Sequence, residues 1–302
     1  MTNISVIGSG TIGNGITHVF AQYGYKVSLI DISDEALKKA VDTIQKNLTR
    51  QVEKGTIQEQ QKNSALQNIT TSNDMRKGIE NAELIVEAAT ENVDLKLKIF
   101  RELDEHTSGS AILATNTSSI SITKIGSVTN HPENVVGMHF MNPVPLMKLV
   151  EVIRGKNTSD EVTHQVMNIA KKLEKIPVEV NDAPGFVANR ILMPMINEAI
   201  CALHDGVSGV AEIDTVMKLG MSHPMGPLQL ADFIGLDVCL SIMNVLHEGF
   251  GTSKYAPSPL LVEMVNAGTL GIKSRKGFYD YQNGSKELLV ASRFIRNIRE
   301  SR

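Results

Sequence analysis

The sequence predicts a doubly wound α/β fold with a mostly parallel sheet, followed by a smaller all-helical domain at the C-terminus. Short apolar runs alternate with helical patterns as far as residue 181. This order is typical of βαβ units, which place ligands at the carboxyl ends of their strands. From residue 186 onward the apolar runs have helical spacing and are separated by glycine and proline. We therefore predict two domains, residues 1–183 and residues 184–302.

The first predicted strand, residues 4–8, runs directly into a glycine-rich turn and a helical pattern. In the pattern Gly-x-Gly-x-x-Gly the first glycine allows the tight turn, and the second lets a pyrophosphate approach the backbone. The third lets the helix pack on the strand. The phosphates would lie at the positive end of the helix dipole. We predict a Rossmann-type dinucleotide site at Gly8, Gly10, Thr11, Ile12 and Gly13.

The second predicted strand, residues 27–31, supports this interpretation because it ends in an acid, Asp31. A carboxylate at this position would accept hydrogen bonds from both hydroxyls of the adenosine ribose and would repel a 2′-phosphate. The expected cofactor is therefore NAD. The alternative is a glycine-rich turn beside an ordinary acidic helix cap.

A helical excursion, residues 34–67, separates the second strand from the third, residues 68–72. Its first helix should begin after the N-cap Ser33 and stop at Gly55, and residues 56–59 have the form of a capping box for a second helix. Four cations fall near one face of the first helix: Lys39, Lys46, Arg50 and Lys54. Such a face could bind phosphate, although a solvated surface is the more common use.

Polar side chains follow the next two strands, residues 84–89 and 111–116. Asn116 and Ser118 lie at the carboxyl end of the second of these, where amide and hydroxyl groups can bind a nicotinamide or a substrate hydroxyl. The alternative is that they are ordinary turn and cap residues. Glu87 and Glu91, around the end of the preceding strand, are equally ambiguous.

The next predicted strand, residues 135–140, carries His139 near its end. A proline-containing turn then returns the chain to an apolar run with one carboxylate, Glu151. A buried glutamate without a partner would cost several kcal/mol, roughly, so a histidine alongside it is the economical explanation. In such a pair the carboxylate fixes one ring nitrogen and the other nitrogen moves a proton. The alternative is a core histidine and an edge-strand glutamate that never meet.

Beyond the turn at Pro184, helices are expected at residues 186–203, 210–219, 236–246 and 260–267. The first of these is apolar on more than one side. It should therefore be buried, either within its own domain or against a second subunit.

Composition argues against several classes of protein. The 302 residues carry a formal net charge of −3, which gives no general case for binding nucleic acid. No apolar run reaches the roughly 18 residues that span a bilayer, and the chain begins with a strand rather than a targeting peptide. The two cysteines, Cys201 and Cys239, are far apart, and no two histidines have the spacing of metal ligands. We expect a cytoplasmic protein without a resident metal.

Over essentially its whole length, the sequence resembles the L-3-hydroxyacyl-CoA dehydrogenase family, most of all the bacterial 3-hydroxybutyryl-CoA dehydrogenases. The motifs that carry the resemblance keep the family's order and spacing. They are residues 8–13, 87–92, 115–119, 139–143, 148–151, 184–190, 223–227 and 277–279.

The resemblance implies NAD-dependent oxidation of a short-chain L-3-hydroxyacyl-CoA to the 3-ketoacyl-CoA, and the reverse reaction. It implies that His139 is the catalytic base with Glu151 as its partner, and that Ser118 and Asn189 hold the oxygen atoms of the substrate. Further NAD contacts are implied for Asp31, Glu91, Lys96, Asn116, Ser118 and Asn142, and a contact with the CoA phosphates for Lys54. The family dimerises through its helical domain, so a homodimer is expected.

Other functions fit the sequence less well. A related NAD-dependent dehydrogenase of sugar acids, of the L-gulonate type, shares much of this fold and keeps the histidine. Relatives with a lysine base do not match the pair of His139 and Glu151. A non-catalytic NAD-binding protein would have no need for these two residues together with Ser118 and Asn189.

Overall fold

The computed structural model describes residues 1–281 and 288–295, which form two compact units. The first unit comprises residues 1–186 and the second begins at Val187. The predicted boundary, after residue 183, lies beside this division. Each unit has its own hydrophobic core.

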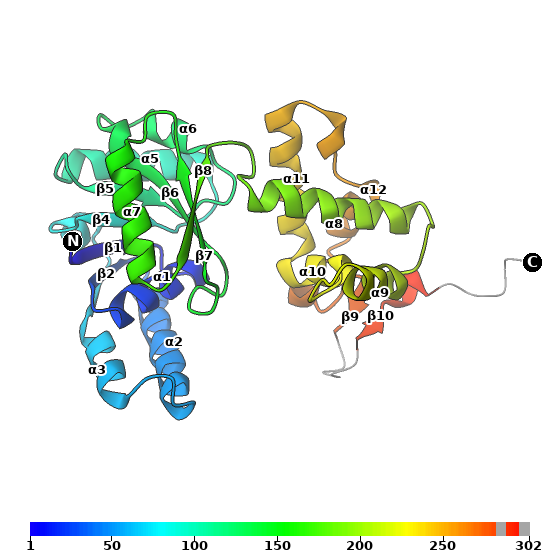
Figure 1. Ribbon diagram of the computed structural model, residues 1–302, viewed down its shortest axis with the longest axis horizontal. Coiled ribbons are helices and arrows are strands. Elements are labelled where there is room, and N and C mark those ends of the chain that lie inside the picture. The colour runs from blue at the N-terminus through cyan, green and yellow to red at the C-terminus, as the bar shows by residue number, and fades with distance from the viewer. Residues whose placement is uncertain (282–287, 296–302) are drawn as a thin grey trace, which may run out of the picture. The chain divides into compact units, whose positions relative to one another are not determined.

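The first unit is built on an eight-stranded sheet with the order β3-β2-β1-β4-β5-β6-β7-β8 (Figure 1). The strands are β1 (Asn3–Ile7), β2 (Lys26–Ile30), β3 (Ile69–Ser72), β4 (Leu84–Glu87), β5 (Ile112–Thr115), β6 (Val135–Phe140), β7 (Leu149–Arg154) and β8 (Ile176–Asn181). All neighbouring strands are parallel except β6 and β7, which are antiparallel. The predicted doubly wound, mostly parallel sheet is confirmed.

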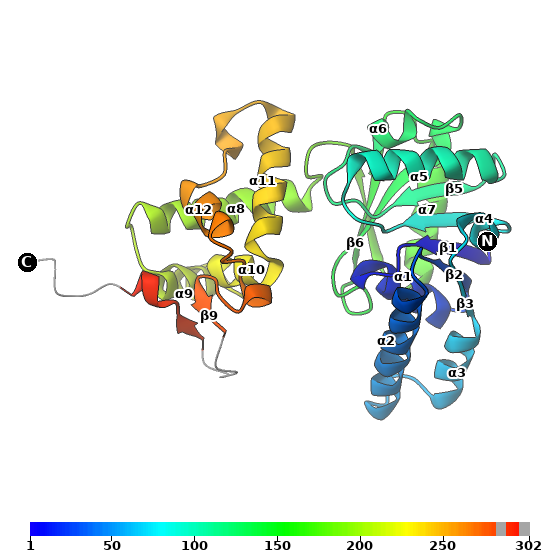
Figure 2. The ribbon, with the colours of Figure 1, turned by 180° about the vertical axis from the view of Figure 1, so that it is seen from behind.

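Helices cover both faces of this sheet, as Figure 1 and, from behind, Figure 2 show. They are α1 (Thr11–Gln22), α2 (Asp34–Glu53), α3 (Glu59–Gln67), α4 (Met75–Ile79), α5 (Val93–His106), α6 (Ile122–Gly126) and α7 (Asp160–Lys172), with a short 3-10 turn, η1 (Pro132–Asn134). Successive side chains of a strand point to opposite faces of the sheet. Val6 belongs to the core that α1 and α7 share, and Ile7 to the core beneath α5 and α6.

The order of the strands reverses between β1 and β4, because the chain leaves β1 toward β2 and later returns on its other side. In open α/β sheets the crevice at such a switch point receives the ligand. The glycine-rich turn follows β1 directly. The fold therefore brings the predicted dinucleotide residues to the switch point.

The helical excursion forms as predicted, with one correction. Helix α2 ends at Glu53, and Gly55 follows with a φ of +70°, a conformation that glycine adopts easily. The predicted capping box at Thr56 and Glu59 is wrong. The N-cap of α3 is Gln58, whose N–H donates to Gln61 Oε1 at 2.7 Å. The capping box therefore begins two residues later than predicted.

The second unit is mainly helical. It contains α8 (Ala188–His204), α9 (Val210–Gly220), α10 (Pro227–Ile234), α11 (Leu236–Phe250) and α12 (Pro259–Asn266), with 3-10 turns η2 (Ser253–Tyr255), η3 (Ile272–Ser274) and η4 (Ser292–Phe294). Two details correct the sequence-based expectation. Helix α10 was not predicted, and β9 (Tyr279–Asp280) pairs antiparallel with β10 (Leu289–Val290), so the domain is not all helical.

Within the described ranges, 1–281 and 288–295, no single helix is long and apolar enough to cross a bilayer. Together α10 and α11 reach the required length and composition, but the pair is bent by 98°.

Two buried aspartates tie the second unit together. Asp214 accepts hydrogen bonds from the N–H groups of Leu228 and Gln229, which open α10, and from the hydroxyl of Tyr279. Asp232 accepts from the N–H groups of Phe278 and Tyr279 and from the hydroxyl of Tyr281. Glycine is required beside each carboxylate. A Cβ on Gly226 would lie 2.2 Å from Asp214 Cγ, and one on Gly277 would lie 1.9 Å from Asp232 Oδ1.

The charge on Asp232 makes stability depend on pH. Burial raises its pKa to about 6, against the hydrogen bonds that it accepts from Tyr279, Phe278 and Tyr281. An unfolded aspartate titrates near 3.9. Because the folded-state pKa is the higher one, the stabilising effect of the protonated carboxyl is complete below about pH 4. It is lost as the pH rises toward 6.

We therefore expect the stability advantage of the wild type over Asp232→Asn to fall by about 2 kcal/mol between pH 4 and pH 7. Urea unfolding of both proteins at several pH values measures this difference, in which the titrations of groups that do not interact with Asp232 cancel. An advantage that stays constant, or grows with pH, would contradict the prediction.

Candidate active site

The glycine-rich turn has the geometry that a dinucleotide requires. Gly8 has a φ of +97°, and a Cβ there would lie 2.7 Å from Ala88 O on the neighbouring segment. A Cβ on Gly13 would lie 1.8 Å from Gly8 O, so only glycine lets α1 start this close to β1. A Cβ on Gly10, by contrast, would meet no described atom within 4 Å. The open space is at the middle glycine, where a pyrophosphate would approach the backbone and the positive end of α1.

Asp31, directly after β2, is bound to this turn. Its Oδ2 accepts from the N–H and the hydroxyl of Ser9, at 2.8 and 2.7 Å, and its Oδ1 accepts from the N–H of Ser33 at 3.1 Å. Burial alone would raise the pKa of Asp31, but the hydrogen bonds from Ser9 and Ser33 outweigh it and hold the pKa below its usual value. Asp31 is therefore charged at neutral pH.

His139 and Glu151 meet across the antiparallel pair β6–β7, where they occupy directly opposite positions. The distance between His139 Nδ1 and Glu151 Oε2 is 2.8 Å, and both side chains are buried. The carboxylate accepts the proton of Nδ1, which leaves Nε2 with a lone pair. Nε2 lies 3.1 Å from Ser118 Oγ. This arrangement can take a proton from a bound hydroxyl group or return one to it.

The turn between these two strands is fixed by a buried lysine that sequence reasoning missed. Lys175, directly before β8, donates from Nζ to the carbonyls of Val144 and Met147 at 2.6 and 2.8 Å. Burial lowers the pKa of Lys175. The peptide bond between Asn142 and Pro143 in this turn is cis, and the side chain of Asn142 is exposed. A buried lysine before an edge strand gives no local signal, because its acceptors are backbone carbonyls distant in sequence.

The polar residues after β4 and β5 form one connected cluster. Asn116 Oδ1 accepts from the N–H of Phe140 at 2.7 Å, next to His139. Glu87, which the sequence left ambiguous, is fully buried and pairs with Lys96, its Oε1 at 2.7 Å and its Oε2 at 2.9 Å from Lys96 Nζ. Glu91 Oε2 lies 3.5 Å from the same ammonium. The elements that carry Ser118, His139 and the predicted cofactor residues are thereby held together.

Two predicted substrate residues belong to other elements. Lys54 is the C-cap of α2, and it is exposed, as are the other three cations of the predicted face. Asn189 lies in the first turn of α8, in the second unit. Their roles remain predictions.

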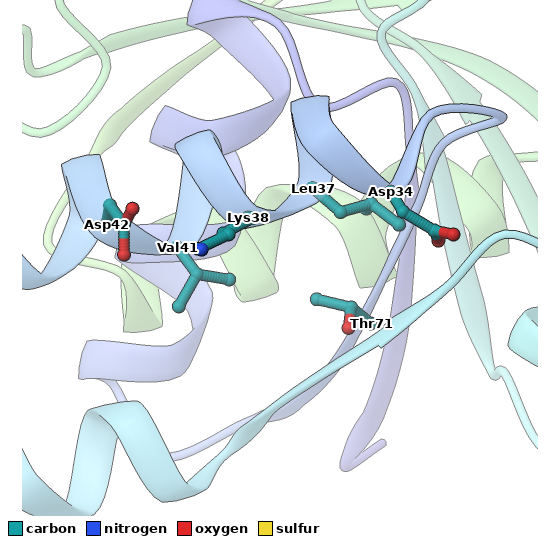
Figure 3. Close-up of a pocket in the computed structure, with 6 residues that line it drawn as sticks. All are labelled: Asp34, Leu37, Lys38, Val41, Asp42 and Thr71. Carbon is teal, nitrogen blue, oxygen red and sulfur yellow. The ribbon is translucent and has the colours of Figure 1, made fainter.

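A cavity of about 360 Å³ lies between α2 and β3. Figure 3 shows its lining residues, of which Asp34, Leu37, Lys38, Val41 and Asp42 follow one another along α2 and Thr71 faces them from β3. None of the six belongs to the predicted site. The cavity is a feature of the helical excursion rather than of the cluster around His139.

Two models of one protein family match this chain between residues 3 and 281. The model of the 3-hydroxyacyl-CoA dehydrogenase NAD-binding domain matches residues 3–183, and the model of the C-terminal domain of the same family matches residues 185–281.

Individual relatives are similar over almost their full length. The chain is 52% identical to a probable 3-hydroxybutyryl-CoA dehydrogenase of Bacillus subtilis, over 92% of this chain and 97% of the relative. It is 51% identical to a 3-hydroxybutyryl-CoA dehydrogenase of Bradyrhizobium diazoefficiens, over 92% and 95%. The crystal structure of (S)-3-hydroxybutyryl-CoA dehydrogenase from Ralstonia eutropha superposes with a TM-score of 0.91 at 47% identity, and the match covers 93% of this chain and 99% of that one.

The contribution of the buried ion pair of Glu87 and Lys96 to stability can be tested without a substrate. Lys96→Met should reduce the free energy of unfolding by about 3–5 kcal/mol, because Glu87 would keep a buried charge without its counter-ion. Lys77→Met is the matched control. Its partner Asp74 lies 3.9 Å away and both side chains are exposed, so this change should cost less than about 1 kcal/mol. Urea unfolding of both variants checks the prediction, and equal losses would show that burial does not govern the pair.

Proposed function

Because the chain belongs to the 3-hydroxyacyl-CoA dehydrogenase family, we propose that it interconverts a short-chain L-3-hydroxyacyl-CoA and its 3-ketoacyl-CoA with NAD as cofactor. The preferred substrate pair is 3-hydroxybutyryl-CoA and acetoacetyl-CoA. The observation that carries the proposal is the geometry at His139, with Glu151 at 2.8 Å on one ring nitrogen and Ser118 at 3.1 Å from the other.

The acid–base chemistry follows from these contacts. NAD, when bound, supplies the acceptor for the hydride that leaves carbon 3 of the substrate. His139 Nε2 takes the proton of the substrate hydroxyl, and Glu151 holds the Nδ1 proton and stabilises the positive ring. In the reductive direction the charged ring returns the proton to the oxygen on which negative charge develops. The hydroxyl of Ser118, beside Nε2, donates a hydrogen bond to the same oxygen.

We assign the cofactor to the switch point of the sheet. Gly8, Gly10, Thr11, Ile12 and Gly13 would hold the pyrophosphate. Asp31 would accept from the adenosine ribose, since its carboxylate is charged and lies beside the turn. For the nicotinamide half we propose residues that follow the carboxyl ends of β4, β5 and β6: Glu91, Lys96, Asn116, Ser118 and Asn142.

The remaining substrate contacts are proposals from the family match. Asn189 would bind the substrate oxygens together with Ser118. Lys54 would meet the CoA phosphates, supported by the exposed cations that share its helix face. If so, Lys54→Glu should weaken a CoA thioester more than a truncated thioester without the nucleotide.

The direct test is NADH oxidation on addition of acetoacetyl-CoA to the purified protein. We expect turnover by the wild type and a loss of about two to four orders of magnitude in His139→Ala, the usual effect of removing a positioned acid or base. L-gulonate with NAD is the control for the sugar-acid alternative. A variant that keeps more than about a tenth of the wild-type rate would place the base elsewhere.

Cofactor choice should depend on Asp31. The wild type should prefer NAD(H) strongly over NADP(H), because a 2′-phosphate would remove one donor and place negative charge against the carboxylate. The neighbouring Ile32 and Ser33 offer no cation to neutralise it. Asp31→Ala should lower kcat/KM for NAD and so reduce the preference for NAD over NADP. Comparison of kcat/KM for the two cofactors measures this, and equal values in the wild type would show that Asp31 does not recognise the ribose.

We further propose a cytoplasmic homodimer joined through the second unit. Several large apolar side chains of this unit are exposed, namely Ile191, Val207, Val216, Leu219, Met221 and Phe233. Leu219 on α9 is 81% exposed. Contact with a partner subunit would remove this apolar surface from water. Sedimentation should give a dimer at micromolar concentration that Leu219→Glu dissociates. Ile176→Glu, at an exposed position of β8 in the first unit, should leave it intact. A monomeric wild type would refute the assembly.

A further inference from the structure

One carboxylate oxygen accepts four hydrogen bonds from the turn that carries Ser118. Glu91 Oε1 accepts the N–H groups of Ser118 and Ser119 at 2.9 and 3.2 Å, and the hydroxyl of Ser119 at 3.0 Å. It also accepts the hydroxyl of Thr117 at 2.5 Å. Four donors from three consecutive residues therefore converge on a single atom. This segment lies between β5 and α6, outside the sheet ladder, so these contacts hold the Ser118 backbone together with the hydrogen bonds that Thr117 Oγ1 accepts from the N–H groups of Ser119 and Ile120.

The other carboxylate oxygen of Glu91 lies close to the buried ion pair of Lys96 and Glu87. Lys96 Nζ lies 3.5 Å from Glu91 Oε2 and binds Glu87 and the carbonyl of Ala89. Lys96 is 1% exposed and Glu87 is 0% exposed, so neither can move without a large loss of packing and charge pairing.

A second route leads from the same ion pair to the same turn. Glu87 Oε2 accepts the hydroxyl of Thr115 at 2.7 Å, and Thr115 Oγ1 accepts the N–H of Thr117 at 3.2 Å. Two chains of contacts thus connect the buried charges to the residues on either side of Ser118.

We propose that Glu91 is the positioning residue for Ser118. Backed by Lys96 and Glu87, it fixes the Ser118 hydroxyl against His139 Nε2 and so sets where the reacting oxygen is bound. The role rests on the dehydrogenase function proposed above, and it is additional to any contact of Glu91 with the cofactor. Its physical basis is that charge-assisted hydrogen bonds are short and strong. A displacement of about 1 Å at a reacting group can cost about 100-fold in rate.

The first test needs neither substrate nor cofactor. The nitrogen resonance of His139 Nε2 reports its contact with the Ser118 hydroxyl. Ser118→Ala should shift this resonance, and Glu91→Ala should shift it in the same direction. The double variant should show no further shift. Asp94→Asn is the matched control, since Asp94 is an exposed carboxylate in the first turn of α5 and its loss should leave the resonance unchanged.

The second test is a double-mutant cycle on turnover. Glu91→Gln, which keeps an acceptor but loses the charge, should lower kcat about 10-fold, and Glu91→Ala about 100-fold. In the Ser118→Ala background either change should cost less than about 2-fold, because there is no hydroxyl left to position. Fluorescence titration with NADH measures the part of the effect that belongs to cofactor binding. Asp94→Asn should keep the wild-type kcat.

The outcomes distinguish a failure of the positioning role of Glu91 from a failure of the proposed dehydrogenase function. Equal losses of kcat in the presence and absence of the Ser118 hydroxyl, or an unshifted His139 resonance in folded Glu91→Ala, would overturn the positioning role. Circular dichroism identifies a folded variant, and Glu91→Gln replaces Glu91→Ala if the latter does not fold. A wild type inactive with acetoacetyl-CoA would refute the proposed function, and the resonance measurement would still decide whether Glu91 positions Ser118.

Discussion

The buried carboxylate of Glu151 imposes the constraint on which the first unit depends. A charged group inside a strand is tolerated only beside a partner that pairs with it. The partner is available because β7 runs antiparallel to β6, in the register that sets Glu151 directly opposite His139. A slip of one residue would move the side chain to the other face of the sheet. The requirement to pair one charge therefore fixes the register of the two strands and, with it, the orientation of the imidazole.

The two units stabilise their buried charged side chains in different ways. In the first unit, the opposite charges of Glu87 and Lys96 pair with each other and join β4, α5 and β5. In the second unit, Asp214 and Asp232 are satisfied by N–H and hydroxyl donors, and glycine stands where a side chain would collide with the carboxylate. Burial raises the pKa of both aspartates against the hydrogen bonds that they accept, so each gains a proton more easily than an exposed aspartate would.

The candidate site thus consists of two hydrogen-bonded parts on one sheet. The glycine-rich turn and Asp31 lie at the end of β1 and β2, tied together through Ser9. Ser118 and His139 lie at the ends of β5 and β6, tied through Asn116 and Glu91. Parallel strands deliver their carboxyl ends to one edge of the sheet, so both parts lie at the same edge. Precise hydride and proton transfer requires such preorganised support.

The sequence by itself determined the class of fold, the nucleotide fingerprint and the identities of the paired residues His139 and Glu151. These features leave local signals: apolar periodicity, glycine spacing and a carboxylate that needs a partner. Only the tertiary structure decided how Glu87, Lys96 and Lys175 are used, where α3 begins, and that α10 and a short strand pair complete the second unit. Lys175 binds backbone carbonyls 28 and 31 residues away, and a contact of that kind leaves no pattern along the chain. Glu87 and Lys96 belong to a strand and to the helix that follows it, and the periodicity of neither element predicts that the two side chains meet.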